Sequence, residues 1–152
     1  MINKKIVICT TIKNEAKNLN SYFRLLDKII NIFEDYFLIF IESESRDKTS
    51  VMVEKYLKNK KGKIINKELD TSLNRIVKLE ICRNEYLDYV KNSNVLKGFD
   101  YLIVMDADGV NNKLNTKNLK NSLLNNINWN AIFANQSLFY YDIFALRIDN
   151  FI

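Results

Sequence analysis

The sequence predicts an α/β fold with a mostly parallel central sheet flanked by helices. Three short, mainly apolar runs, at residues 6–10, 37–41 and 99–105, lack the strict polar–apolar alternation of a strand with one solvated face. Between these runs lie longer segments whose apolar residues recur at helical spacing. Strands that alternate with helices in this way form parallel sheets through right-handed crossovers.

The first half of the chain is expected to alternate strand, helix, strand and helix. Residues 6–10 form the first expected strand, and residues 15–33 follow as a helix whose apolar positions lie three or four residues apart. Residues 37–41 form the second buried strand. A further helix follows the next turn, with Asp47 or Thr49 as its N-terminal cap.

The second half continues the same alternation and contains the acidic motif discussed below. The run at residues 99–105 is expected to be a strand buried on both faces, because it is apolar and bounded by turn residues. In order, the expected elements are a strand at 63–66, a helix at 74–91, the strand at 99–105, a helix at 116–127, a strand at 131–135 and an apolar segment at 140–146.

The composition is that of a single cytoplasmic domain. The chain has 152 residues, enough for one hydrophobic core but not for several. It contains no histidine, and its two cysteines, Cys9 and Cys82, lie far apart in apolar segments. Zinc sites and Ser–His or Cys–His catalysis are therefore not expected, and both thiols are expected to be buried and free. No leader peptide or segment of membrane-spanning length is recognisable.

The excess of basic residues indicates an attraction to anions. The formal net charge is +5 and the isoelectric point is near 9.1. A charge of this size is typical of a lysine-covered solvated surface; the alternative is attraction to a nucleotide, a nucleic acid or an anionic membrane as partner. Charge alone does not choose among these partners.

Two carboxylates, Asp106 and Asp108, come directly after the apolar run that ends at Met105, and Gly109 follows them. Ligands of open α/β sheets bind outside the carboxyl ends of the strands, which is where this pair is expected to project. Two carboxylates there either hold a divalent cation such as Mg²⁺ or Mn²⁺, or supply a nucleophile.

Other polar residues are expected at the same edge of the sheet. Thr11 and Glu15 follow the first strand, Glu42 ends the second, and Arg83 lies on the helix before the acidic strand. A carboxylate such as Glu42 can accept hydrogen bonds from a base or a ribose, and an arginine can pair bidentately with phosphate oxygens. A divalent cation on the acidic pair would bridge to the same phosphates. This set of groups suits a nucleoside diphosphate.

Five short motifs follow one another along the chain, and together they carry a family resemblance. They are Asn14-Glu15, then Glu42-Ser43-Glu44-Ser45 with Asp47 and Thr49, then Arg83-Asn84, Asp106-Ala107-Asp108, and Tyr-Tyr-Asp-Ile-Phe-Ala-Leu-Arg at 140–147. The first resembles the opening of glycosyltransferases with the A-type fold. The second is similar to a Glu-Ser-x-Ser-x-Asp-x-Thr stretch of the fungal capsule α-1,3-mannosyltransferases. The other three resemble the Arg-Asn, Asp-x-Asp and Tyr-Asp-x-x-Ala-x-Arg motifs of that family.

The resemblance implies a fold, a reaction and an incomplete enzyme. Residues 1–152 would be the Rossmann-like nucleotide-sugar-binding half of a glycosyltransferase A-type fold, without the C-terminal acceptor-binding part. The resemblance leaves open whether that part lies on a separate chain or was lost by truncation of the gene. The implied reaction is hexosyl transfer, with mannose as the family's sugar, to a glycan acceptor of a cell-surface polysaccharide. It would take place in the cytoplasm, at the inner face of the membrane and with no nucleic-acid partner.

The resemblance also implies roles for individual residues. The donor would be a nucleotide-diphosphate sugar, GDP-mannose or a UDP-sugar, with Mn²⁺ or Mg²⁺ as cofactor. Asp142 would be the catalytic residue, near the transferred sugar or the acceptor. Asp106 and Asp108 would hold the metal, and the residues expected to bind the nucleotide sugar are Thr11, Glu15, Glu42, Arg83, Asp106 and Arg147.

Two alternatives stay open at this point. An apolar strand followed by Asp-x-Asp-Gly-Val is also typical of phosphatases of the haloacid dehalogenase type, in which Asp106 would be the nucleophile and Asp108 a general acid. The chain could equally be a non-catalytic or degenerate fragment that binds nucleotide, because the acceptor-binding part is missing. A calcium-binding loop is excluded, because Gly109 falls at the fourth loop position and not at the sixth.

Overall fold

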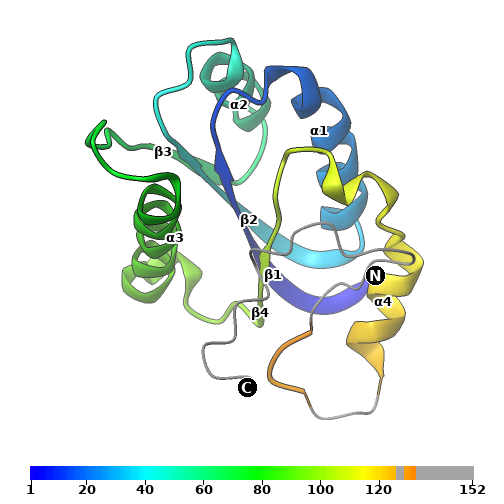
Figure 1. Cartoon of the computed structure of the whole chain (residues 1–152). Helices are drawn as coiled ribbons and strands as arrows, with labels where there is room; N and C mark the ends of the chain where they lie inside the picture. Colours follow the sequence, from blue (N-terminus) through cyan, green and yellow to red (C-terminus); the bar gives the residue numbers. More distant parts are fainter. Residues whose placement is uncertain (126–128, 133–152) are drawn as a thin grey trace, which may run out of the picture.

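The computed structural model describes residues 1–125 and 129–132. Within them the chain forms an α/β fold in which a four-stranded, all-parallel sheet lies between helices, which confirms the predicted α/β class with a parallel central sheet (Figure 1). The strand order is β3-β2-β1-β4. In chain order the elements are β1 (Ile2–Ile12), α1 (Ala16–Ile30), β2 (Phe33–Glu42), α2 (Thr49–Leu57), β3 (Gly62–Asn66), α3 (Arg75–Asn92), η1 (Asn94–Leu96), β4 (Tyr101–Val104), η2 (Val110–Lys113) and α4 (Thr116–Leu124), where η marks a 3₁₀ helix.

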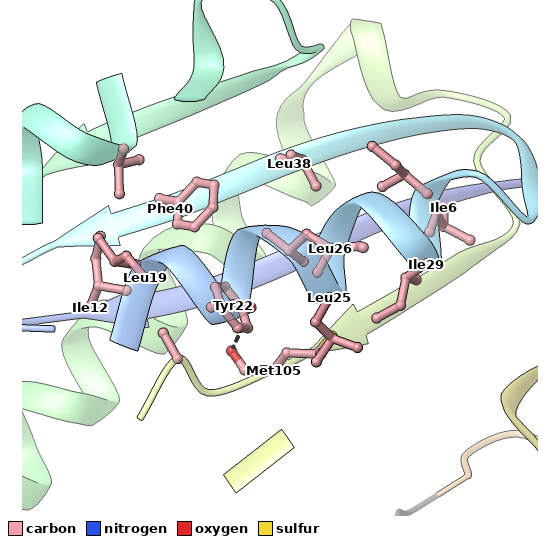
Figure 2. Packing of buried hydrophobic residues seen from close by; sticks show 14 of the residues in the cluster. Ile6, Ile12, Leu19, Tyr22, Leu25, Leu26, Ile29, Leu38, Phe40 and Met105 are labelled. Carbon is pink, nitrogen blue, oxygen red and sulfur yellow. Dashed lines mark hydrogen bonds between the residues drawn. The ribbon is translucent and has the colours of Figure 1, made fainter. Parts of the chain in front are cut away.

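Helix α1 buries one apolar face against the sheet. Its buried residues Leu19, Tyr22, Leu26 and Ile29 recur every three or four positions, so they lie on one side of the helix (Figure 2). They join a core cluster with Phe40 of β2 and residues of α2, while residues of α4 pack at its margin. Each fully buried aliphatic side chain of this kind contributes about 1.5–3 kcal/mol.

Helix α3 covers the opposite face of the sheet. Val7 and Cys9 of β1 and Ile39 of β2 point to this side and form a second core cluster with Tyr86 of α3. Because β1 and β2 are covered on both faces, they read as continuous apolar runs. Burial raises the pKa of the Cys9 thiol to about 12, and both cysteines are buried and free, as the sequence predicts.

Helix α1 ends three residues earlier than the apolar spacing indicates. The expected helix ran to Phe33, but α1 ends at Ile30 and Phe33 is the first residue of β2. The chain turns at Asn31 and Ile32, where the Ile32 carbonyl accepts a hydrogen bond from the Ile2 amide at 2.6 Å. Phe33 is buried, as a helical residue at that spacing would be, but it belongs to the sheet.

Strand β4 is not buried on both faces, so this part of the prediction is wrong. Tyr101 and Ile103 pack toward the cluster that contains α1, whereas Leu102 and Val104 are 41% and 50% exposed. Within the described residues, β4 is an outer strand that pairs only with β1. Helix α3 packs over β1 and β2 instead, which leaves one face of β4 open to solvent.

The end of the chain is described only in part. Helix α4 ends at Leu124, three residues short of the predicted end. Ala131 and Ile132 belong to no strand, and the rest of the strand expected at 131–135 lies outside the described residues, as does the apolar segment at 140–146. Across residues 1–125 and 129–132, no helix is both long and apolar enough to cross a membrane.

Candidate functional site

The sheet reverses its direction of growth between β1 and β4. From β1 the chain adds β2 and then β3 on one side, and it then crosses back along α3 to place β4 on the other side of β1 (Figure 1). The carboxyl ends of β1 and β4 are neighbours there, since Cys9 pairs with Val104 and the Met105 amide donates to the Cys9 carbonyl at 3.0 Å. Such a switch point is where open α/β sheets bind their ligands.

The acidic turn after β4 presents both carboxylates outward. Met105 and Ala107 are buried, whereas Asp106 and Asp108 are exposed, so the alternation of the extended chain continues through the turn. Gly109 closes the turn with φ +95°, a left-handed conformation that glycine adopts without strain. The position predicted for the acidic pair is therefore confirmed.

Two side-chain hydrogen bonds hold the shape of this acidic turn. The Val110 amide donates to Asp108 Oδ1 at 3.1 Å, and the Asn111 side-chain amide donates to the Asp106 carbonyl at 2.7 Å. The first is an Asx-type turn contact, which fixes the backbone directly after the carboxylate. Neither hydrogen bond uses up the acceptor capacity of the Asp108 carboxylate, which has about four lone-pair positions.

A buried tyrosine that the sequence did not single out lies beneath the acidic turn. Tyr22 points from α1 toward Met105, and its hydroxyl donates to the Met105 carbonyl at 3.5 Å (Figure 2). The same hydroxyl is hydrogen-bonded to Thr10 of β1. Burial raises the pKa of Tyr22, and the nearby charge of Asp106 raises it further, so the phenol stays neutral. Its position between Leu19 and Leu26 at helical spacing is the signal that could have identified it.

Glu42 ends β2 at the same edge, and its burial has a local explanation. It is 6% exposed, and a buried carboxylate needs a partner. That partner is the Ser45 amide, which donates to Glu42 Oε1 at 2.6 Å. Because Ile12 pairs with Glu42, the carboxylate lies on the strand next to β1.

The residues after Glu42 join the two loops that follow β1 and β2. The Asn14 amide donates to Ser45 Oγ at 2.9 Å, and the Glu15 amide donates to Thr49 Oγ1 at 2.8 Å. In the opposite direction, the Arg46 amide of the loop after β2 donates to Asn14 Oδ1 of the loop after β1 at 2.8 Å. The polar residues of this motif thus have structural partners.

The Asp47 carboxylate accepts hydrogen bonds from the first backbone amides of two helices, α1 and α2. Its Oδ2 accepts from the Ala16 amide of α1 at 3.1 Å, and its Oδ1 accepts from the Thr49 amide of α2 at 2.9 Å. The sequence predicted Asp47 or Thr49 as a cap for α2 only. The amino end of α1 is therefore closed by side chains of the neighbouring loop, which leaves those amides satisfied without a ligand.

The remaining predicted residues differ in burial and in their hydrogen-bond partners. The Glu15 carboxylate accepts from the Asn18 side chain at 2.7 Å, and Thr11 is half-buried in β1 opposite Ile41. Arg83 lies at an exposed position of α3.

The charges of Arg83 and Asp106 both affect the buried Tyr86 of α3. Burial raises the pKa of Tyr86, Arg83 lowers it and Asp106 raises it, so both charges act on the same phenol. Tyr86, one helical turn after Cys82, is a second residue that sequence reasoning did not single out.

The described residues do not supply a complete metal cage. Within residues 1–125 and 129–132, no three histidine, cysteine, aspartate or glutamate side chains are grouped so that they could hold a metal ion. Asp142 and Arg147, which the sequence predicted near the sugar, lie outside the described residues.

Comparisons with known proteins identify no family. No protein-family model matches the chain, and no curated protein matches its sequence.

Proposed function

We propose that this chain binds a nucleotide-diphosphate sugar together with Mn²⁺ or Mg²⁺ and acts as the donor-binding part of a glycosyltransferase. The observation that carries the proposal is the pair of exposed carboxylates, Asp106 and Asp108, on a turn at the switch point of a parallel sheet. The resemblance of five ordered motifs supports GDP-mannose or a UDP-sugar as donor and a glycan as acceptor. The reaction would take place at the cytoplasmic face of the membrane.

The available ligands fit a hard divalent cation that is shared with a substrate. Mg²⁺ is usually bound by one or two carboxylates, by water and by substrate phosphates, and seldom by an all-protein cage. Asp106 and Asp108 would hold it, which is consistent with the lack of a third ligating side chain among the described residues. When bound, the cation would neutralise charge on the departing diphosphate.

Other residues would bind and orient the nucleotide. The exposed Arg83 guanidinium, which forms no ion pair with a described residue, would pair with diphosphate oxygens in a bidentate manner. Glu42 accepts one amide, which leaves acceptor capacity for a ribose hydroxyl or a base N–H. Thr11 and Glu15 would contribute at the edge of the same site. Asp142 and Arg147 remain proposed for the sugar and the acceptor on the motif resemblance alone.

Calorimetry with GDP and UDP, each with Mn²⁺ and with a chelator, tests donor binding. We expect binding that depends on the metal, and a loss of more than about tenfold in affinity for Asp108→Asn. Asparagine keeps an oxygen for the Val110 amide and removes only the charge, so this variant separates metal binding from the shape of the turn. Glu42→Gln should weaken nucleoside binding and keep the metal dependence. Asp88→Asn, at an exposed position of α3, is the matched control.

Each alternative has its own outcome in these experiments. The absence of metal-dependent heat with either nucleotide would overturn the proposal. Nucleotide binding that persists in the chelator and is unchanged in Asp108→Asn would indicate a degenerate nucleotide-binding fragment. Hydrolysis of a simple phosphate ester that disappears in Asp106→Asn would indicate the phosphatase, in which this residue is the nucleophile.

A further inference from the structure

A hollow on the flank of the molecule, between α1 and η2, lies outside the proposed donor site. It has a volume of about 210 Å³ and is lined by Ser21, Arg24, Leu25 and Lys28 of α1 together with Asn112 and Leu114. The four α1 residues are spaced three, four and seven positions from the first, so they form one face of the helix. Leu25 is buried and Leu114 packs against the core, which gives the hollow an apolar floor and a polar rim.

Two cations on this face have no ion-pair partner among the described residues. Arg24 and Lys28 are exposed, and neither forms an ion pair with any of the described residues. Asp27, which lies between them in sequence, is engaged elsewhere, because it pairs with Lys60 at 2.7 Å and accepts from the Tyr56 hydroxyl at 2.9 Å. Like charges four residues apart on a helix repel each other, so this pair would be stabilised by a bound anion.

The chain segment that supplies Asn112 and Leu114 to the opposite wall of the hollow is rich in lysine. Residues 109–132 include Lys113, Lys117 and Lys120 and contain no aspartate or glutamate. Helix α4 packs against the same core cluster as α1, so its lysines add to the positive potential of this flank.

We propose that this hollow binds a phosphate-type oxyanion, such as the phosphate group of a phosphomonoester. Arg24 can pair with two phosphate oxygens at once, Lys28 supplies a second charge, and the Ser21 hydroxyl and the Asn112 amide are neutral donors. The volume of about 210 Å³ is below the roughly 300–1,000 Å³ of sites for drug-sized ligands, which favours a small anionic group over a whole nucleotide. This site does not depend on the proposed donor site and needs no metal.

The hollow is nonetheless connected to the acidic turn through η2. Asn112 lines the hollow, and its neighbour Asn111 donates to the carbonyl of Asp106 at 2.7 Å. An anion that contacts Asn112 is therefore expected to alter the environment of the amides from Gly109 to Asn112 as well.

Titration of the whole ¹⁵N-labelled chain with inorganic phosphate and with methyl phosphate, without metal and at constant ionic strength, tests this proposal. We expect saturable shifts of the Ser21, Arg24 and Asn112 amides. The double variant Arg24→Gln/Lys28→Gln should lose more than about tenfold in affinity.

The matched control removes two lysine charges from another surface hollow. Lys55 and Lys58 of the α2 region line another surface hollow, but Glu54 shares it and offsets their charge. Lys55→Gln/Lys58→Gln should therefore bind phosphate like the wild type. Shifts that rise linearly without saturation, or equal losses in the two double variants, would show only diffuse attraction to a basic surface and would refute the site.

Vesicle binding distinguishes two sources of the phosphate group, a lipid headgroup and a soluble phosphomonoester. Co-sedimentation with phosphatidylcholine vesicles that contain phosphatidic acid, lost in Arg24→Gln/Lys28→Gln but not in the control, would identify a lipid headgroup as the ligand. Saturable binding of methyl phosphate without co-sedimentation would identify a soluble phosphomonoester.

Discussion

The buried contact between Thr10 and Tyr22 gives the most direct test of how the fold supports the acidic turn. The two residues are 1% and 2% exposed, and their hydroxyls are hydrogen-bonded to each other. Tyr22→Phe keeps the ring and its packing and removes only the phenolic oxygen. The Thr10 hydroxyl then loses this partner in the core.

The expected loss in the free energy of unfolding follows from a general property of buried hydrogen bonds: removing one partner costs more than removing both. Leaving one buried polar group without its partner costs about 1–3 kcal/mol, whereas replacing both partners by apolar groups of the same shape is nearly neutral. Thr10→Val should cost a similar amount, because Tyr22 then keeps only its 3.5 Å contact with the Met105 carbonyl. The double variant should be less destabilised than the sum of the single variants by at least about 1 kcal/mol.

Urea unfolding followed by circular dichroism measures all four corners of this double-mutant cycle. For a domain of this size, each kcal/mol lowers the melting temperature by about 2–4 °C, so thermal scans provide a second measure. Tyr89→Phe is the control, since its ring stacks on Phe37 and its hydroxyl makes no hydrogen bond to another described residue. Strictly additive costs in the cycle would refute the coupling between the two hydroxyls.

Three further predictions concern other parts of the fold. Gly62→Ala should destabilise the protein by about 1–3 kcal/mol, because its Cβ would lie 2.7 Å from a backbone carbonyl of β2; urea unfolding checks this. Thr49→Val should cost about 1–3 kcal/mol by leaving the Glu15 amide without its buried acceptor, whereas Thr49→Ser keeps that acceptor and should show less loss in the same assay. The hydrogen bond and charge of Lys4 lower the pKa of Asp100, so the folded state binds this proton more weakly than the unfolded state. Its contribution is present above about pH 4 and is lost as the pH falls, and unfolding measured across the acid range should show a shallower loss for Asp100→Asn.

The order of strands and helices could be predicted because each apolar run has the length and composition of a buried strand. The boundaries were harder to predict, as Phe33 shows. Its spacing from Ile29 and Ile30 matches a helix, yet the turn at Asn31 ends α1 first. Periodicity reports which residues are buried, and a buried residue just after a helix satisfies the same pattern in a strand.

The exposure of β4 depends on a tertiary feature that no local pattern contains. Leu102 and Val104 are as apolar as the buried residues of β1. They are exposed because α3 packs against β1 and β2 and not against β4. The sequence therefore identifies the strand and leaves open which of its faces is covered. The same limit applies to Tyr22 and to the Arg24 and Lys28 pair, whose surroundings are set by elements distant in the chain.

The polar motif residues at the sheet edge fall into two groups, those that the backbone needs as hydrogen-bond acceptors and those whose charge the fold does not need. A resemblance of sequence motifs does not distinguish the two groups. Ser45, Asp47 and Thr49 accept backbone amides of the neighbouring loop, so a chain that binds no nucleotide would also need them. Among the described residues, Asp108 accepts only from the amide two residues ahead, a contact that an uncharged asparagine makes equally well. Its negative charge is therefore not required by the turn, and for this reason the loss of that charge alone is the most specific test of a metal-binding role.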